Sequence, residues 1–145
     1  NIFHIILTPG LWAFHMLEAW TRGSVWTGTG KVLGDWEDLK PRSEYAHRIT
    51  GAYYSARLGV LEQMDSMRRS GACLLWRDIG PGYWAPVGVW LIRETVREAM
   101  KQAPKQFDSL KHAVDYVAPR VSAPDDLRNS WFVKRSRQTT LDSFV

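Results

Sequence analysis

Apolar residues gather along this chain in two kinds of pattern, short continuous runs and longer stretches with helical spacing. Residues 2–7 form a run rich in isoleucine that ends at Pro9-Gly10, which predicts a buried strand followed by a turn. Residues 72–76 predict a second core strand. In residues 11–20 the aromatic positions fit both alternation and helical spacing, and we expect a strand there.

Helical spacing dominates the middle of the chain and much of its C-terminal half. The clearest stretch begins at the N-cap candidate Ser43 and carries apolar residues over about half of its circumference. The expected helices cover residues 43–69, 88–102 and 108–117, with a short helix after Pro124. We therefore expect an α+β fold in which a mixed sheet packs against several helices, with a flexible C-terminal tail.

Two segments lack the pattern of a core element. Residues 21–41 contain several glycines and few periodic apolar positions, so we expect a long surface connection. Residues 134–145 are basic and polar at first, and we expect a tail that is disordered until a partner binds it. Residues 1–133 are then expected to form a single mixed α/β domain.

Composition narrows the class of protein. The chain has 145 residues, 45% of them hydrophobic, which is enough for one domain with a real core. Its apolar runs are far shorter than the roughly 18 residues that cross a bilayer, so we expect a soluble protein with no membrane partner. The single cysteine, Cys73, cannot form an intrachain disulfide, which fits a cytoplasmic location. A net charge of +4 is mildly basic and only suggests a polyanionic partner.

The residues that most often bind metals show no ligand spacing. The four histidines are not spaced as a metal site with each other or with carboxylates. Asp35, Glu37 and Asp38 form a small acidic run inside the glycine-rich connection, and a solvated loop explains them better than a metal site. No metal is therefore expected, and no cofactor is evident.

The end of the chain carries a spaced set of one polar and two apolar residues. Gln138, Leu141 and Phe144 recur every three residues, so a 3₁₀ turn would place all three side chains on one side. Exposed Leu and Phe near a C-terminus favour a partner with a groove to receive them. The spacing resembles the PCNA-interacting peptide, the Q-x-x-L-x-x-F box with which replication and repair proteins bind the sliding clamp.

That resemblance implies a role for each position. Gln138 would enter a small polar pocket of the clamp, and the two apolar anchors would fill its hydrophobic groove. Many such peptides have two adjacent aromatic residues, but here the second position is Val145, which should weaken docking. Lys134, Arg135 and Arg137 could steer the peptide towards an acidic rim. The alternative is a tail that packs on its own domain.

The body of the chain also has segments with a family resemblance. They are residues 49–58, residues 86–90 leading into 93–97, and Pro9-Gly10 followed by aromatic residues. These segments resemble the C-terminal half of the archaeal Nre family of DNA repair proteins, whose members end in a clamp-binding peptide. The resemblance implies repair of DNA damage together with PCNA, and it brings no established catalytic residues. It also implies that residues 1–133 are the C-terminal part of a larger protein.

Arg57 stands out within the longest expected helix. It lies near the centre of the apolar arc, where a bare guanidinium is costly to bury, so it needs a partner. One reading is a structural ion pair. The other is an anion-binding arginine with Tyr53 or Tyr54 beside it.

A basic stripe marks the next expected helix. Arg93, Arg97 and Lys101 are spaced by four residues and could follow a phosphate backbone. Glu94 and Glu98 cross the same region, so a solvated helix face is the alternative.

These observations support three hypotheses of different classes. The leading one is a DNA repair factor that docks on the PCNA clamp through its C-terminal peptide and acts at damaged DNA. The second is a nucleotide- or phosphodiester-directed enzyme with an anion pocket lined by Arg57, Arg77, Arg93 and Arg97. The third is a structural adaptor. Whether the protein is an enzyme stays open at this point.

Overall fold

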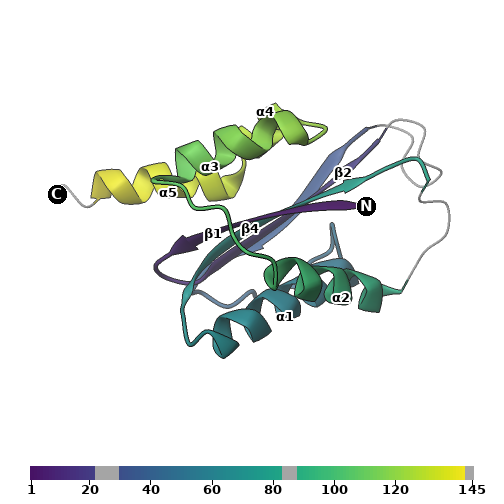
Figure 1. Ribbon diagram of the computed structural model, residues 1–145, viewed down its shortest axis with the longest axis horizontal. Coiled ribbons are helices and arrows are strands. Elements are labelled where there is room, and N and C mark those ends of the chain that lie inside the picture. The colour runs from purple at the N-terminus through teal and green to yellow at the C-terminus, as the bar shows by residue number, and fades with distance from the viewer. Residues whose placement is uncertain (22–29, 83–87, 143–145) are drawn as a thin grey trace.

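The computed structural model describes residues 1–21, 30–82 and 88–142 of the chain. Within them, one sheet is covered by helices on both faces (Figure 1). The elements in chain order are β1 (Ile2–Pro9), β2 (Ala13–Trp20), β3 (Val32–Glu37), α1 (Gly51–Ser66), β4 (Gly71–Ile79), α2 (Val89–Met100), α3 (Leu110–Val117), the 3₁₀ turn η1 (Ala118–Arg120), α4 (Pro124–Arg128) and α5 (Trp131–Asp142).

The sheet is mixed, with strand order β1-β4-β2-β3. Strand β4 is antiparallel to β1 and parallel to β2, while β3 is antiparallel to β2. Because β2 and β4 run in the same direction, a crossover through β3 and α1 joins them. The expected α+β fold with a mixed sheet is confirmed.

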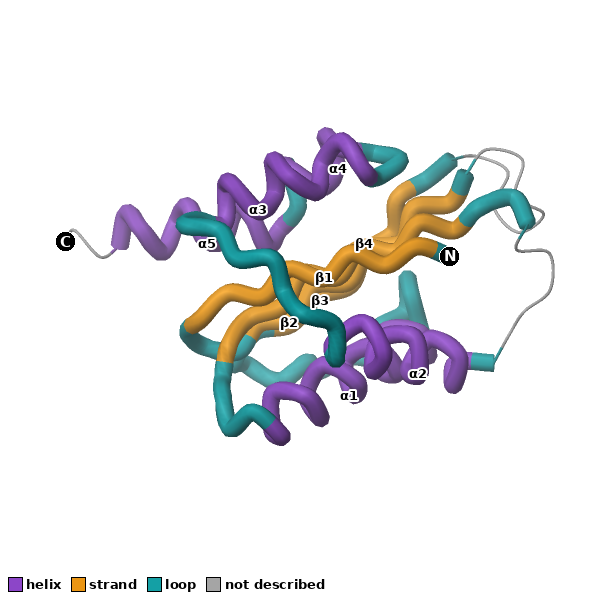
Figure 2. The backbone as a smooth tube through the Cα atoms, in the orientation of Figure 1, coloured by secondary structure: helices purple, strands orange, loops and turns teal. Residues whose placement is uncertain are grey.

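Helices α1 and α2 cover one face of the sheet, and α3, α4 and α5 cover the other (Figure 2). Side chains therefore alternate between two cores along each strand: Leu75 of β4 packs with α1 and α2, whereas Leu74 and Trp76 pack with α3 to α5. All residues from Ala13 to Ala19 of β2 are buried, because a strand covered on both faces has no solvent side.

The glycine-rich segment contains a strand that the hydrophobic pattern did not predict. Expecting only a surface connection over residues 21–41 was wrong, because β3 pairs with β2 there. Its inward positions Asp35 and Glu37 are acids, and both are buried rather than part of a solvated loop. A strand with carboxylates on its buried face lacks the apolar alternation that marks most half-buried strands.

Helix α1 is shorter than the spacing predicted. It begins at Gly51, not at Ser43, and Ser43 caps no helix. Thr50 has φ 59° and ψ −133°, a conformation outside the helical region that ends the preceding turn. The carboxylate of Asp35 accepts hydrogen bonds from the backbone N–H groups of Arg48 and Ile49, at 3.0 and 2.8 Å. The segment before α1 is therefore held as a turn by β3.

The last helix, α5, starts within the expected domain and continues into the expected tail. Phe132 and Val133 in its first turn are buried in the core beside α3 and α4. The predicted boundary at residue 134 thus falls inside a helix that runs to Asp142. Polar residues follow the apolar first turn, so the sequence shows no helical stripe beyond residue 133.

His15 of β2 is buried beneath α5. Its ring meets the Trp131 ring edge to face, with 5.9 Å between ring centroids. Within the described residues its Nδ1 atom has no hydrogen-bond partner. Burial lowers the pKa of His15 from 6.5 to about 4, because the protonated ring would be desolvated.

This buried histidine predicts a pH dependence of stability. The unfolded chain takes up the proton near pH 6.5 and the folded chain only near pH 4, so stability should fall as pH drops between these values. The loss should approach roughly 3 kcal/mol. Urea unfolding at several pH values measures it. In His15→Phe, which keeps an aromatic ring there, the free energy of unfolding should lose this part of its dependence on pH. An unchanged pH dependence would show that other groups cause it.

Candidate functional site

A buried carboxylate of β3 organises the inner side of α1. Oε1 of Glu37 accepts hydrogen bonds from Nε1 of Trp12 at 2.8 Å and from Nε of Arg57 at 2.7 Å. Oε2 accepts from the Tyr53 hydroxyl at 3.1 Å. The Arg57 guanidinium also lies 5.7 Å from the centre of the Trp12 ring. The expectation that Arg57 has a partner is confirmed, and that partner is Glu37.

The two neighbouring tyrosines Tyr53 and Tyr54 have different hydrogen-bond partners. Burial, followed by the neighbouring Glu37 carboxylate, raises the pKa of Tyr53, so its hydroxyl stays protonated and donates. Tyr54 points elsewhere, because its hydroxyl accepts the backbone N–H of Ala46 at 2.9 Å. Arg57 and Tyr53 therefore meet at a carboxylate of their own chain, and binding of an external anion by them stays a prediction. Tyr54 is not part of that contact.

An open depression of about 470 Å³ lies beside this cluster. Its wall combines charged and aromatic side chains from β3, the following turn and α1: Glu37, Pro41, Arg42, Ser43, Glu44, Tyr45, Tyr54 and Arg57. Arg42 is engaged here as well, since its Nη1 donates to the Trp36 carbonyl at 2.6 Å. Acids and arginines are mixed in this wall, so it offers no concentrated charge of either sign.

Arg77 of β4 forms a second, separate ion pair. Its Nη1 donates to Oε1 of Glu18 on β2 at 2.6 Å, and both side chains are at most 5% exposed. Its Nε donates to Oδ1 of Asn1 at 3.0 Å. Burial raises the pKa of Glu18, and the Arg77 charge opposes that rise. The pair is a part of the protein interior that the sequence did not reveal.

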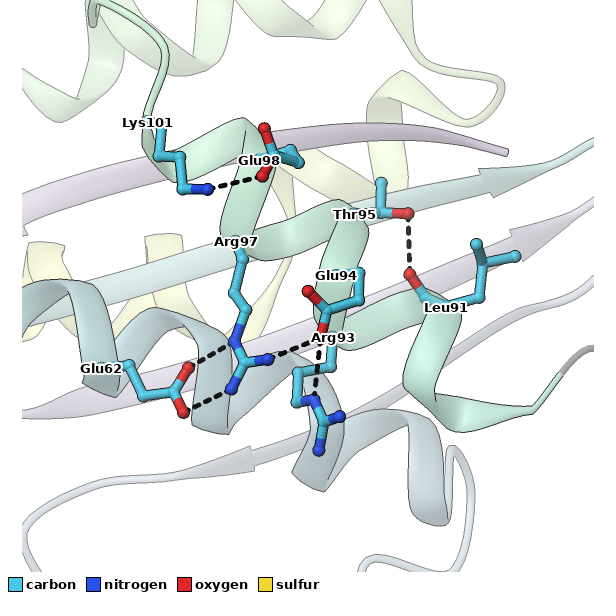
Figure 3. A network of polar contacts seen from close by, with 8 residues as sticks. All are labelled: Glu62, Leu91, Arg93, Glu94, Thr95, Arg97, Glu98 and Lys101. Atoms are coloured by element: carbon cyan, nitrogen blue, oxygen red, sulfur yellow. Dashed lines mark hydrogen bonds and ion pairs between the residues drawn. The ribbon is translucent and has the colours of Figure 1, made fainter.

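The predicted basic stripe of α2 is interleaved with acids (Figure 3). Arg97 donates from Nε and Nη2 to both oxygens of Glu62 on α1, at 2.7 and 2.6 Å, and from Nη1 to Glu94 at 2.5 Å. The hydrogen bond from Arg97 lowers the pKa of Glu62. Arg93 contacts the same Glu94 at 3.3 Å. The bonds between Arg97 and Glu62 tie α2 to α1, whereas the contacts to Glu94 lie within α2.

Lys101 continues the same alternation one turn later. Its Nζ lies 2.6 Å from Oε1 of Glu98, and both side chains are mostly exposed. A phosphate arriving at this stripe would have to compete with Glu62, Glu94 and Glu98. Phosphate binding by Arg93, Arg97 and Lys101 remains a prediction.

The four arginines named for an anion pocket thus occupy three groups of ion pairs. Arg57 binds Glu37, Arg77 binds Glu18, and the two arginines of α2 share Glu94. Each of these arginines thus pairs with a glutamate of the chain. In the part of the chain that the structure describes, these contacts distribute the arginines instead of gathering them around one anion.

A surface that the sequence reasoning missed lies at the start of α5. Trp36 of β3 stacks on Trp131 of α5, with 4.2 Å between ring centroids and 12° between ring planes. Beside Trp131 is an open depression of about 540 Å³, lined by Asp38, Asn129, Trp131, Lys134, Arg135 and Gln138. The available signal was a tryptophan placed directly before a basic segment.

Only some of the predicted clamp-binding residues belong to the part of the chain that the structure describes. Gln138 belongs to α5 and its side chain is exposed. The backbone of Leu141 is also in α5. Phe144 and Val145 lie outside the described residues, so the structure does not test the complete spacing.

Comparison with known proteins decides the family. The family model for the C-terminal part of archaeal Nre proteins matches residues 37–144, most of the chain. The chain belongs to the archaeal Nre family. No solved structure matches it.

Relatives of this Nre chain come from two archaea. It is 39% identical over 145 residues to DNA repair protein NreA of Archaeoglobus fulgidus, covering 99% of the chain and 36% of that relative. It is 37% identical to DNA repair protein NreB of the same organism, covering 100% of the chain and 38% of the relative. Identity to DNA repair protein NreA of Haloferax volcanii is 34%, with 100% and 36% covered. The chain spans little more than a third of these relatives.

Two kinds of feature are absent from the residues of the Nre chain that the structure describes. No group of three or more His, Cys, Asp or Glu side chains is arranged to hold a metal ion there. Among the same residues, no helix is long and apolar enough to cross a bilayer.

Proposed function

We propose that this Nre chain serves DNA repair and docks on the PCNA sliding clamp through its C-terminal residues. The supporting observation is the Q-x-x-L-x-x-F spacing of Gln138, Leu141 and Phe144 at the end of a chain from this family. The names of the relatives support the repair role. A place in the cytoplasm, with the nucleoid, follows from this proposal.

The start of the motif is accessible to a partner. Gln138 and the neighbouring Arg137 are exposed on α5, and Lys134 is exposed one turn earlier. In an α-helix, residues three apart drift around the axis, whereas a 3₁₀ turn aligns them. Docking in the aligned form therefore requires the end of α5 to tighten or unwind. The free energy needed to open a terminal helical turn is generally small.

Tethering to the clamp makes a weak DNA contact effective. A clamp encircling DNA holds the bound chain close to the duplex, which raises the effective concentration of DNA at its surface. A net charge of +4 then need not supply the whole affinity for DNA. We propose that the body of the chain contacts DNA in this tethered state.

Loss of one aromatic anchor should remove clamp binding. Calorimetry of the 145-residue chain with PCNA should show binding that weakens at least about 30-fold in Phe144→Ala, because a buried anchor dominates such interfaces. Leu141→Ala should weaken it similarly. Thr140→Ala, between Gln138 and Leu141 of the motif, is the matched control and should bind like the parent. Equal affinities for Phe144→Ala, Leu141→Ala and the parent would refute clamp docking through this peptide.

A further inference from the structure

The surface at the start of α5 combines an aromatic platform with positive charge. We name it the α5 depression and define it by the six residues that line it, Asp38, Asn129, Trp131, Lys134, Arg135 and Gln138. Trp36 adjoins it through its stack on Trp131. Trp36 is 44% exposed, although one face of its ring is stacked on Trp131.

We propose that the α5 depression and Trp36 bind unpaired nucleotides of single-stranded DNA. A base would stack on the tryptophan pair, and Lys134 and Arg135 would contact the phosphates. This proposal rests on the role at DNA proposed above, and it assigns the contact to a surface on the opposite side of the sheet from the predicted stripe of α2.

The aromatic part fits a base. An indole ring that is already stacked is held rigidly, so a base gains contact without the cost of ordering the platform. Trp131 is fixed in turn by the edge of His15 beneath it. Exposed aromatic rings are the usual platforms for single strands, because every base has a face that can stack. Bases inside a duplex have their faces covered, so this platform selects unpaired ones.

The charge of the depression also fits. Lys134 is exposed, and the Arg135 guanidinium lies over the Trp131 ring at 5.6 Å from its centre. Asp38 is the acid in the lining, and its carboxylate already accepts the backbone N–H of Lys40 at 2.9 Å. Two cations against one acid leave a positive local charge.

The polar lining supplies contacts beyond charge. Asn129 and Gln138 are exposed at the depression, and amide groups can both donate and accept hydrogen bonds at base edges, although Nδ2 of Asn129 already donates one hydrogen bond to the Asp125 carbonyl at 2.9 Å. Such contacts tolerate several bases, so we expect binding with little sequence preference.

The test is direct binding of a labelled 12-nucleotide oligo(dT) to the 145-residue chain, followed by fluorescence anisotropy. Trp36→Ala should weaken binding about tenfold or more, since stacking on an aromatic ring carries much of such affinity. Trp36→Phe keeps a ring and should retain most of it. Trp90→Ala is the matched control: Trp90 is 60% exposed but lies on α2, and its loss should leave binding unchanged.

A second arm tests the phosphate contacts and the class of ligand. Lys134→Gln should weaken binding and lower the salt dependence by about 0.7 in the logarithmic slope, the value for one phosphate contact of a single strand. Oligo(dT) should bind tighter than a blunt duplex of the same length. Tighter binding of the duplex, or of oligo(U), would overturn the assignment to single-stranded DNA.

The outcomes separate this inference from the proposed function. If oligo(dT) binds equally to the parent, Trp36→Ala and Trp36→Phe, the site is elsewhere and the inference is wrong, while clamp docking is untouched. If the parent binds no oligo(dT), the inference is likewise wrong. Should circular dichroism show that Trp36→Ala is misfolded, Trp36→Phe and Lys134→Gln decide: parent-like affinity and salt slope in Lys134→Gln would overturn the inference.

Discussion

Glu18→Ala is expected to destabilise the protein by roughly 3–5 kcal/mol, the usual cost of removing one partner of a buried ion pair. Glu18 and Arg77 bridge β2 and β4 at the centre of the sheet, with 2.6 Å between Oε1 and Nη1. Without the carboxylate, the Arg77 charge would remain in a site where its side chain is 4% exposed. Urea or thermal unfolding, followed by circular dichroism, measures the change.

The paired substitution provides the control. Glu18→Leu together with Arg77→Met removes both charges and keeps most of the volume, so it should recover much of the stability lost in Glu18→Ala. Burial already raises the pKa of Glu18 despite the Arg77 charge, which indicates that desolvation offsets much of the attraction. A loss below about 1 kcal/mol in Glu18→Ala would contradict a buried pair.

Glu37→Ala is the second change with a large expected effect, again on the order of 3–5 kcal/mol. The carboxylate of Glu37 is 7% exposed and accepts hydrogen bonds from Trp12, Tyr53 and Arg57. Alanine would leave the three donors facing a small void with no acceptor. Chemical denaturation with tryptophan fluorescence is a suitable measurement, because Trp12 belongs to the cluster.

Two milder variants separate the contribution of the Glu37 charge from that of Arg57. Glu37→Gln keeps the size and an acceptor oxygen but loses the charge, and should cost about 1–2 kcal/mol. Arg57→Met should cost less than Glu37→Ala, because the Arg57 side chain is 36% exposed and Glu37 keeps its bonds to Trp12 and Tyr53. If Arg57→Met unfolded the protein as far as Glu37→Ala does, the ion pair rather than the carboxylate's full set of donors would hold α1 on β3.

The elements with ordinary apolar patterns were predictable. β1, β4, α2 and α3 all lie close to their expected ranges, because the two strands carry continuous apolar runs and the two helices carry apolar side chains at helical spacing. β4 extends past the expected strand end, to Ile79, and its last residues Arg77 and Asp78 are polar. At this end of β4 an ion pair between Arg77 and Glu18 joins the strands, and the hydrophobic pattern does not predict it.

β3 was hidden for a similar reason. Its inward positions are Asp35 and Glu37, whose partners come from α1 and from the turn before it. Its Gly34 suggested a loop, but a Cβ at that position would lie 2.7 Å from Cδ2 of Leu17 and 3.0 Å from Nε2 of His15. The glycine is there to let two strands and a buried imidazole approach each other.

For the candidate site, the sequence predicted single residues but not the partners that they contact. A central arginine on an apolar helix face demanded a partner, but nothing in the sequence singled out Glu37 among the nearby acids. The stack of Trp36 on Trp131 joins an early strand to the last helix, and such a contact depends on the complete fold. The motif at the C-terminus needs no fold to be read, because its spacing is local.

The strand order also has a consequence for how the protein is made. β1 leaves the ribosome before the other strands of this sheet, yet its partner in the sheet is β4, which is synthesised after β2, β3 and α1. β2 likewise waits for β4 on its other side, so the growing chain holds two strands with unpaired edges until β4 emerges. Such edges can pair with other chains. The yield of folded protein should therefore depend on how fast α1 and β4 are translated and on chaperones that cover β1 and β2. Changes in translation speed after Ile79 should affect it less.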